Sequence, residues 1–201
     1  MKNSLLLILI CFTIQSLIAQ EDDFRTIQGS SEIKVSGFGG PIMSFTQIGD
    51  DFVHLLGGGG GVIINNFFIG GYGVGKTNQI YYKNDVLKDN VMLYGHGGFW
   101  FGYTIMGNRA IHPVLHTQIG WGKITQMEKD WQSQIITPDP VSIDQVFVIS
   151  PTAEIELNFS RFFRLGGGFT YSMVYNTDGP YTFNDFAKPG FFLSLKFGYF
   201  R

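Results

Sequence analysis

The feature that most constrains this chain is the alternation of bulky apolar residues with smaller or polar ones near its C-terminus. In residues 190–200 every second side chain is large and apolar: Phe191, Leu193, Leu195, Phe197 and Tyr199. The other face carries Phe192, Ser194, Lys196, Gly198 and Phe200, most of them small or polar. A period of two is that of a β-strand, whose successive side chains point to opposite faces. The segment is therefore predicted to be a strand with one bulky apolar face.

The same period recurs along most of the chain. Residues 162–176 and 145–158 also alternate between bulky apolar side chains and small or charged ones. Residues 52–64 and 67–77 are too rich in glycine, and too apolar on both sides, to assign their faces. Turn residues between the periodic segments divide the chain into eight predicted strands. These are 32–46, 52–64, 67–77, 91–104, 110–124, 145–158, 162–176 and 190–200.

The connections between these strands alternate in length. The second, fourth and sixth are tight turns, at 65–66, 106–109 and 159–161. The third, fifth and seventh are long, at 78–90, 125–144 and 177–189. Transmembrane barrels have short periplasmic turns at one rim and longer loops at the other. The sequence thus predicts an all-β fold, an eight-stranded antiparallel up-and-down transmembrane barrel.

The alternative is a soluble, lipocalin-like secreted barrel with the bulky faces inside. An eight-stranded barrel has an interior just wide enough to be filled by side chains. Four to six bulky groups from each strand would overfill it, so the small and charged face is predicted to point inward. Charged residues are only 15% of the chain, against about 25% in soluble domains. The bulky face is therefore predicted to contact lipid.

On its strand alternation, loop asymmetry and aromatic final strand, the chain resembles the small eight-stranded outer-membrane barrels of the OmpX-like and OmpA-transmembrane-domain type. The resemblance covers residues 32–200 and is architectural, so it transfers no catalytic residue. It implies an outer-membrane location and assembly by the barrel-assembly machinery, which reads a final strand ending on an aromatic residue. Here Arg201 follows Phe200.

The N-terminal segment has the pattern of an export signal. Lys2 precedes an unbroken apolar run over residues 5–12, and Ala19 supplies the small residue that a signal peptidase needs. Residues 1–19 are predicted to be a cleaved signal peptide, residues 20–31 a short periplasmic lead-in, and residues 32–201 the barrel. The only cysteine, Cys11, falls inside the signal.

Five charged residues fall on the predicted inner face, in the half nearest the tight turns: Lys34, Glu154, Glu156, Arg164 and Lys196. Buried charges persist when they are paired, so these residues are predicted to form a lumen charge network. If residues 159–161 form the turn, Asn158 pairs with Phe162 and Glu156 lies directly opposite Arg164.

Two further patterns could carry chemistry. Residues 70–77 match the phosphate-binding sequence G-x-x-x-x-G-K-[ST], but no helical period follows, as that loop requires. His96, His112 and His116 are predicted to share one face of neighbouring strands as hydrogen-bonded core residues. No cofactor or metal site is expected, and a net charge of −2 gives no basic field for nucleic acid.

The leading functional hypothesis is a non-enzymatic envelope protein with a structural or surface-binding role, whose outer loops could bind an extracellular ligand. One alternative is a narrow pore. Another is a membrane-embedded lipid-modifying enzyme, for which a nucleophile and a base must meet near the outer rim. The candidates for that role are Ser44, Asp50, Asp51 and His54.

Overall fold

The computed structural model of the protein describes residues 33–78, 81–85, 88–130, 136–175 and 182–200. The predicted signal peptide and lead-in lie outside these residues, so both stay predictions. The described elements are β1 (Val35–Ile48), β2 (Asp51–Ile64), β3 (Phe67–Lys76), β4 (Tyr81–Asp85), β5 (Lys88–Thr104), β6 (Ile111–Asp130), β7 (Ile136–Asn158), β8 (Phe163–Tyr175), α2 (Phe183–Phe186) and β9 (Lys188–Gly198).

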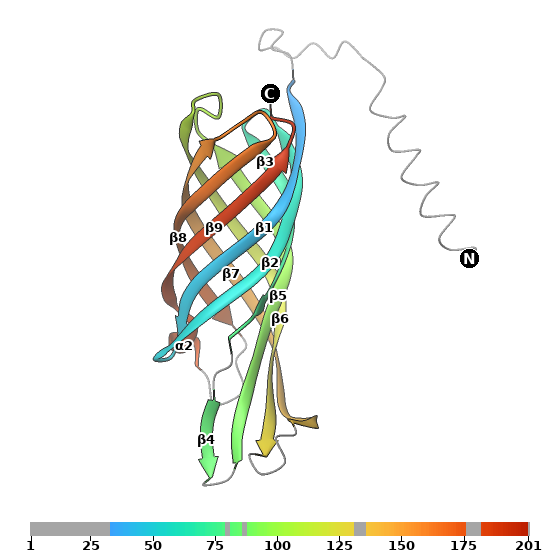
Figure 1. The fold of residues 1–201 in the computed structure, drawn as a ribbon, viewed down its shortest axis with the longest axis vertical. Helices are drawn as coiled ribbons and strands as arrows, with labels where there is room; N and C mark the ends of the chain where they lie inside the picture. Colours follow the sequence, from blue (N-terminus) through green and yellow to red (C-terminus); the bar gives the residue numbers. More distant parts are fainter. Residues whose placement is uncertain (1–32, 79–80, 86–87, 131–135, 176–181, 201) are drawn as a thin grey trace, which may run out of the picture. The chain divides into compact units, whose positions relative to one another are not determined.

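Eight of these strands close into one antiparallel barrel (Figure 1). Neighbours in the sheet follow the order β3-β2-β1-β9-β8-β7-β6-β5, and pairing between β3 and β5 closes the ring. The first and last barrel strands are joined along six residue pairs, from Phe38 with Gly198 to Phe45 with Phe191. The predicted eight-stranded, all-β, up-and-down barrel is confirmed.

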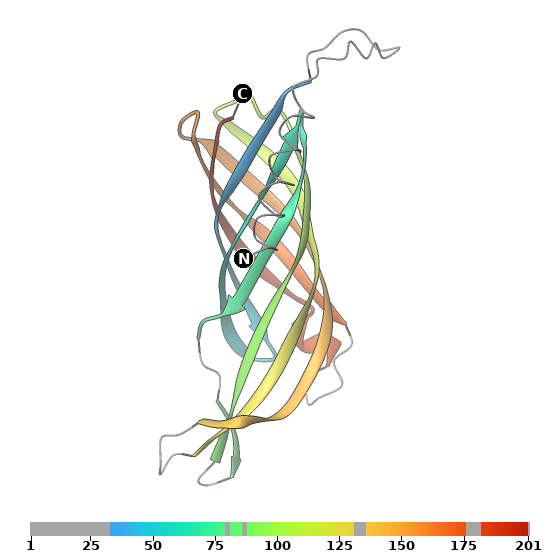
Figure 2. The same cartoon turned by 90° about the vertical axis from the view of Figure 1, so that its right-hand side faces the viewer.

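The predicted loops 78–90 and 125–144 are partly strand, which corrects their assignment. The β5–β6 ladder continues from Thr104 with Val114 to Lys88 with Asp130. β7 extends back to Ile136, and β4 pairs with β5 outside the barrel. The far ends of β5, β6 and β7, together with β4, form an extension that projects beyond the other strands (Figure 2). The sequence of these segments does not alternate strictly between bulky apolar and small or polar residues, so the period of two that identifies the other strands is missing.

The third predicted loop, 177–189, contains the single-turn helix α2. Thr182 and Asp185 form a capping box at its start, and Phe186 is buried in the end of the barrel. No helix among the described residues is long and apolar enough to cross a membrane.

The turn between β2 and β3 is the two-residue hairpin that the sequence predicts. Ile64 pairs with Phe67, and Asn65 has a positive φ of 57°. Asparagine tolerates this left-handed conformation better than most residues. The Asn65 side chain also accepts a hydrogen bond from the Lys34 backbone N–H at 3.0 Å, which ties the turn to the start of β1.

The assigned faces of β7, β8 and β9 are confirmed, because their small or charged side chains point inward, together with the buried Val148, Val174 and Phe192. In the strands that could not be assigned, Val53, Leu55, Phe68 and Tyr72 point inward and are buried. The interior is therefore less polar than predicted. One apolar cluster, around Met92 and Ile124, fills the end with the extension, and a second fills the tight-turn end.

The second cluster is built on three mutually perpendicular rings. Phe38, Phe68 and Trp100 make edge-to-face contacts with centroid separations of 5.3 to 5.5 Å. Glycines on the facing strands make room for them. A Cβ atom at Gly59 would lie 3.0 Å from the Trp100 ring, and one at Gly102 would overlap Phe68 and lie 2.7 Å from the His116 Cβ. Glycine in these strands is thus a packing requirement.

We predict that Gly102→Ala lowers the stability of the barrel by about 1–3 kcal/mol, the usual cost of overpacking a filled core. Gly73→Ala is the matched control, because a Cβ there meets nothing within 4 Å. The midpoint of thermal unfolding, followed by circular dichroism in detergent, measures both. Equal midpoints for the two variants would show that the rings do not need the space at Gly102.

Candidate functional site

A cluster of charged side chains lies inside the tight-turn half of the barrel, on the four strands β6 to β9. Glu154 and Glu156 come from β7, where two residues separate side chains on the same face. Arg164 comes from β8 and Lys196 from β9. The two glutamates are each 2% exposed and Lys196 is 4% exposed. The chain thus places four full charges where water has little access.

Lys196 connects the two carboxylates. Its ammonium donates to Glu154 Oε2 at 2.9 Å and also contacts Glu156 Oε1. Arg164 Nη1 lies 3.3 Å from Glu156 Oε2, and the Ser194 hydroxyl donates to Glu154 Oε1. Two anions and two cations therefore compensate each other, as burial requires.

Two histidines on β6 complete the cluster. His112 Nε2 lies 3.0 Å from Glu156 Oε2, and its other ring nitrogen lies 3.1 Å from the Arg109 carbonyl. His116 Nδ1 accepts a hydrogen bond of 3.0 Å from the Trp100 indole, so its Nε2 carries the proton and faces Glu154 at 3.4 Å. Both are hydrogen-bonded core histidines, as predicted, although their carboxylate partners were not.

The charged cluster packs directly on the aromatic one. The Lys196 ammonium lies 5.3 Å from the centroid of the Trp100 ring and 5.5 Å from that of Phe68. On the other side, the Arg164 guanidinium lies 3.9 Å from the centre of the Phe200 ring. Cations over ring faces are stabilised by the ring quadrupole. The two clusters form one plug across the barrel.

The structure brings together four of the five predicted network residues and leaves out Lys34. The inclusion of Lys34 was wrong, because β1 starts at Val35 and Lys34 is exposed beside the 65–66 turn. Phe38 pairs with Gly198 on β9. Because β1 and β9 are antiparallel and β9 ends at Gly198, Lys34, four residues before Phe38, lies beyond the end of β9. It therefore cannot reach the depth of Lys196.

The predicted pairing of Glu156 with Arg164 was also wrong, by two residues. Glu156 lies opposite Gly166, and Arg164 lies opposite Asn158. The turn is longer than expected, because the N–H groups of Phe159 and Ser160 both bond to the Phe163 carbonyl. A shift of two keeps every side chain on its face. Arg164 therefore still reaches Glu156, from a diagonal position.

The alternatives of an enzyme and a pore find no support in the described residues. Ser44 faces the barrel interior, whereas His54 lies on the outward side and bonds to Thr77 Oγ1 at 2.7 Å. The interior void beside Ser44 holds only about 10 Å³, between the two apolar clusters. Residues 70–77, which match the phosphate-binding sequence, do not form the loop that this sequence requires, because they belong to strand β3 as far as Lys76.

The outward face of the barrel is a continuous apolar surface. Along β6, for example, Ile111, Leu115 and Trp121 are all more than half exposed. The final strand presents its predicted apolar residues there too. Phe191, Phe197 and Tyr199 are exposed and Leu193 and Leu195 are partly exposed, while Lys196 between them is buried.

The solved structures to which this chain is similar include two barrels. Ail, the attachment invasion locus protein of Yersinia pestis, solved in complex with the heparin analogue sucrose octasulfate, is 14% identical, with 84% of this chain and 99% of Ail covered and a TM-score of 0.47. Neisserial surface protein A is 12% identical, with 86% and 99% covered and a TM-score of 0.47. At this identity no residue role is transferred from either. Neither the protein-family models nor the curated proteins give a match to the chain.

We predict that Lys196→Met destabilises the barrel by about 3–5 kcal/mol, because it leaves two buried carboxylates without their shared cation. Lys34→Met, which removes the same charge from the exposed rim, should leave the unfolding midpoint unchanged. Adding Glu154→Gln to Lys196→Met should cost less than the sum of the single effects. Strictly additive losses, or equal losses for the two lysines, would contradict a coupled cluster.

Proposed function

We propose that the protein spans the outer membrane and has a non-enzymatic surface-binding role, carried by the sheet that extends beyond the barrel. The observation that supports this proposal is the combination of two surfaces. The barrel presents bulky apolar side chains outward, and the extension presents unpaired strand edges.

The apolar surface supports insertion into a bilayer. On the outward face of β6, the segment from Ile111 to Trp121 carries no charge, and Lys123 is the first charged residue. This segment has the length of about 9–11 residues that a tilted strand needs to cross the hydrocarbon core. A monomeric soluble protein rarely exposes a contiguous apolar patch larger than a few hundred Å². A closed barrel also satisfies its backbone hydrogen bonds internally, as lipid requires.

The outer membrane is the proposed location because two sequence features agree with it. The segment 1–19 has the pattern of an export signal, and the final strand resembles the signal of the barrel-assembly machinery. Both barrel termini lie at the tight-turn rim (Figure 1). With short turns in the periplasm, as in bacterial barrels, the extension faces the outside of the cell.

The extension supports a binding role because its edges are free among the described residues. β4 pairs on one side only, with β5. β7 pairs with β8 only from Phe147 onward, so residues 136–146 have an unpaired edge on that side. Exposed strand edges add a further strand from an extended peptide through main-chain hydrogen bonds. The ligand class that fits this sheet is an extended polypeptide segment.

The membrane assignment predicts a position-dependent effect of a new charge. Leu195→Arg places a cation on the outward face near mid-barrel and should cost about 2–4 kcal/mol, so that little folded protein is recovered from the membrane fraction. Phe159→Arg makes the same kind of change in the exposed 159–162 turn, where Phe159 is 75% exposed. It should assemble normally. Equal yields of the two variants would argue against a lipid-facing β9.

The binding role predicts that the β6–β7 part of the extension can be removed without loss of the barrel. Gln126 pairs with Ser142, so replacing residues 127–141 with Asn-Gly closes a two-residue hairpin at that point. Intact cells that express the full chain should bind fluorescent, permanently unfolded α-lactalbumin, and cells with the shortened chain should bind less, because the free edge of β7 is shortened while β4 remains. The measurement is cell-bound fluorescence at matched surface expression, and equal binding by the two would contradict the proposal.

A further inference from the structure

Among the described residues, β5 loses its strand partner on one edge where β3 ends, at the end of the barrel that carries the extension. The two strands pair from Phe67 with Tyr103 to Gly75 with Gly95, and β3 stops at Lys76. Thr77 stays beside β2, since its N–H donates to the His54 carbonyl at 3.0 Å, one step beyond the pair of Lys76 with Leu55. β4 resumes pairing with β5 only at Val91. Among the described residues, Met92 to Tyr94 therefore have no strand partner on that edge.

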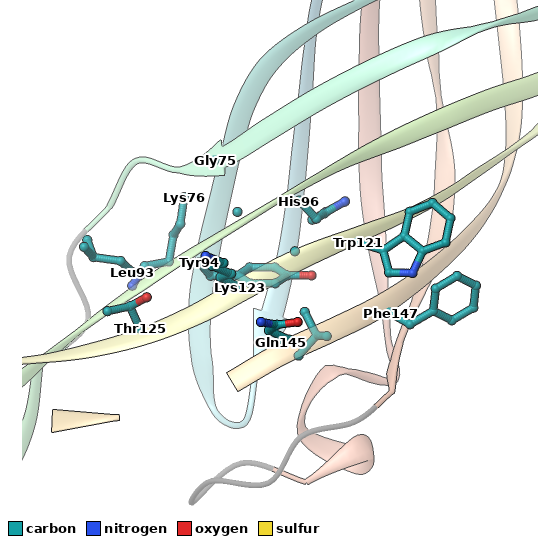
Figure 3. A pocket seen from close by; sticks show the side chains of 13 residues that line it. Gly75, Lys76, Leu93, Tyr94, His96, Trp121, Lys123, Thr125, Gln145 and Phe147 are labelled. Atoms are coloured by element: carbon teal, nitrogen blue, oxygen red, sulfur yellow. The ribbon is translucent and has the colours of Figure 1, made fainter. Parts of the chain in front are cut away.

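A groove of about 760 Å³ lies at this edge (Figure 3). Its lining combines residues from both faces of the wall. Leu93 and Trp121 belong to the exposed, outward face, whereas Tyr94 and His96 belong to the buried, inward face. A ligand in the groove could thus contact the outer surface of the barrel and the edge of its interior together.

The groove contains a buried ammonium without a partner. Lys76 Nζ is shielded from solvent and forms no hydrogen bond with any residue that the structure describes. Asp51, on β2, is the acidic group that interacts with it electrostatically, yet no ion pair joins the two. Burial of an ammonium without a paired charge is unfavourable, so an anion at this position would be stabilised.

A second lysine lies at the level where the apolar surface ends. Lys123 follows Trp121 on the outward face of β6, and it also lines the groove. Tryptophan and lysine are typical of the membrane–water interface, where lipid headgroups lie. If the apolar segment of β6 spans the bilayer, both lysines lie at headgroup level.

The rest of the lining is suited to an acyl chain. The Trp121 and Phe147 rings are packed together with centroids 5.6 Å apart, and Leu93 is 44% exposed on the neighbouring strand. These groups continue onto the apolar outer surface of the barrel. Polar headgroup contacts and apolar chain contacts are therefore adjacent in one groove.

We propose that this groove binds one acidic membrane lipid, with its headgroup between Lys76 and Lys123 and an acyl chain against Trp121. The proposal rests on the membrane location proposed above but is independent of the binding role of the extension. The bound lipid would cover this edge of β5 and supply the charge that Lys76 lacks.

The test uses the purified full chain in detergent, titrated with dioleoyl phosphatidylglycerol or with dioleoyl phosphatidylcholine, with bound lipid counted by native mass spectrometry. The two lipids share their acyl chains and differ in the headgroup, which is anionic in phosphatidylglycerol and zwitterionic in phosphatidylcholine. Phosphatidylglycerol should bind more tightly, with one molecule retained. Lys76→Gln and Lys123→Gln should each weaken its binding about tenfold, the effect of losing a charge-assisted contact.

Lys34→Gln is the matched control, because it removes a lysine from the opposite rim, and its binding should equal that of the original chain. Equal binding of the two lipids would overturn the proposal, as would equal losses for Lys34→Gln and Lys76→Gln. Flotation of every variant with phosphatidylcholine vesicles measures membrane insertion independently of the binding of the acidic lipid. Flotation without selective lipid binding would leave the membrane location in place and reject the lipid site.

Discussion

The bridge from Lys196 to Glu154 and Glu156 is the interaction on which the tight-turn half of the barrel depends. These side chains come from β9 and β7, with β8 between them, and they meet only because the sheet curves into a closed ring. In an open sheet, each charge would lie on a solvated face and contribute little. In the barrel, the same charges are buried and must be paired. Closure and pairing therefore require each other.

The interior divides into two kinds of wall. The strands β1, β3 and β5 supply rings, with Phe38, Phe68 and Trp100 in contact. The strands β6 to β9 supply most of the hydroxyl, carboxylate and cationic side chains, with the Phe192 ring of β9 packed against Trp100. The rings fit because glycines such as Gly59 and Gly102 leave space on the facing strands. The filled interior explains why the narrow-pore alternative receives no support, and it leaves the outer surface and the extension to carry function.

The strands and faces that could be predicted from the sequence are those in which bulky and small residues alternate strictly. In β8 and β9 this alternation is nearly complete, so an odd or even position in the strand is enough to assign each side chain to a face. Register could not be predicted, because it depends on the conformation of the 159–162 turn, where Phe163 accepts two backbone N–H groups. Lys34 was misplaced for a related reason, since its depth depends on how β1 pairs with β9 across the closure.

Several features of the structure were not predicted from the sequence, and one of them could have been. The sequence of the extension of β5 to β7 does not alternate strictly between bulky apolar and polar residues, so it lacks the period of two. The aromatic core lies on glycine-rich strands whose two faces look alike. The carboxylate partners of His112 and His116 could have been found from odd and even positions, because both histidines share the inner face of β6 with Glu154 and Glu156 on β7. The groove at Lys76 follows from where β3 ends, which no local pattern predicts.

The central claim, that bulky side chains face lipid while the interior is filled and closed, is tested most directly by tryptophan quenching in bilayers. Trp121 is 59% exposed on the outward face and Trp100 is 1% exposed inside. Two single-tryptophan variants, each with the other tryptophans replaced by phenylalanine, are reconstituted in vesicles containing brominated phosphatidylcholine. The account predicts strong quenching of Trp121 and little quenching of Trp100. Equal quenching of the two, or quenching of Trp100 alone, would contradict it.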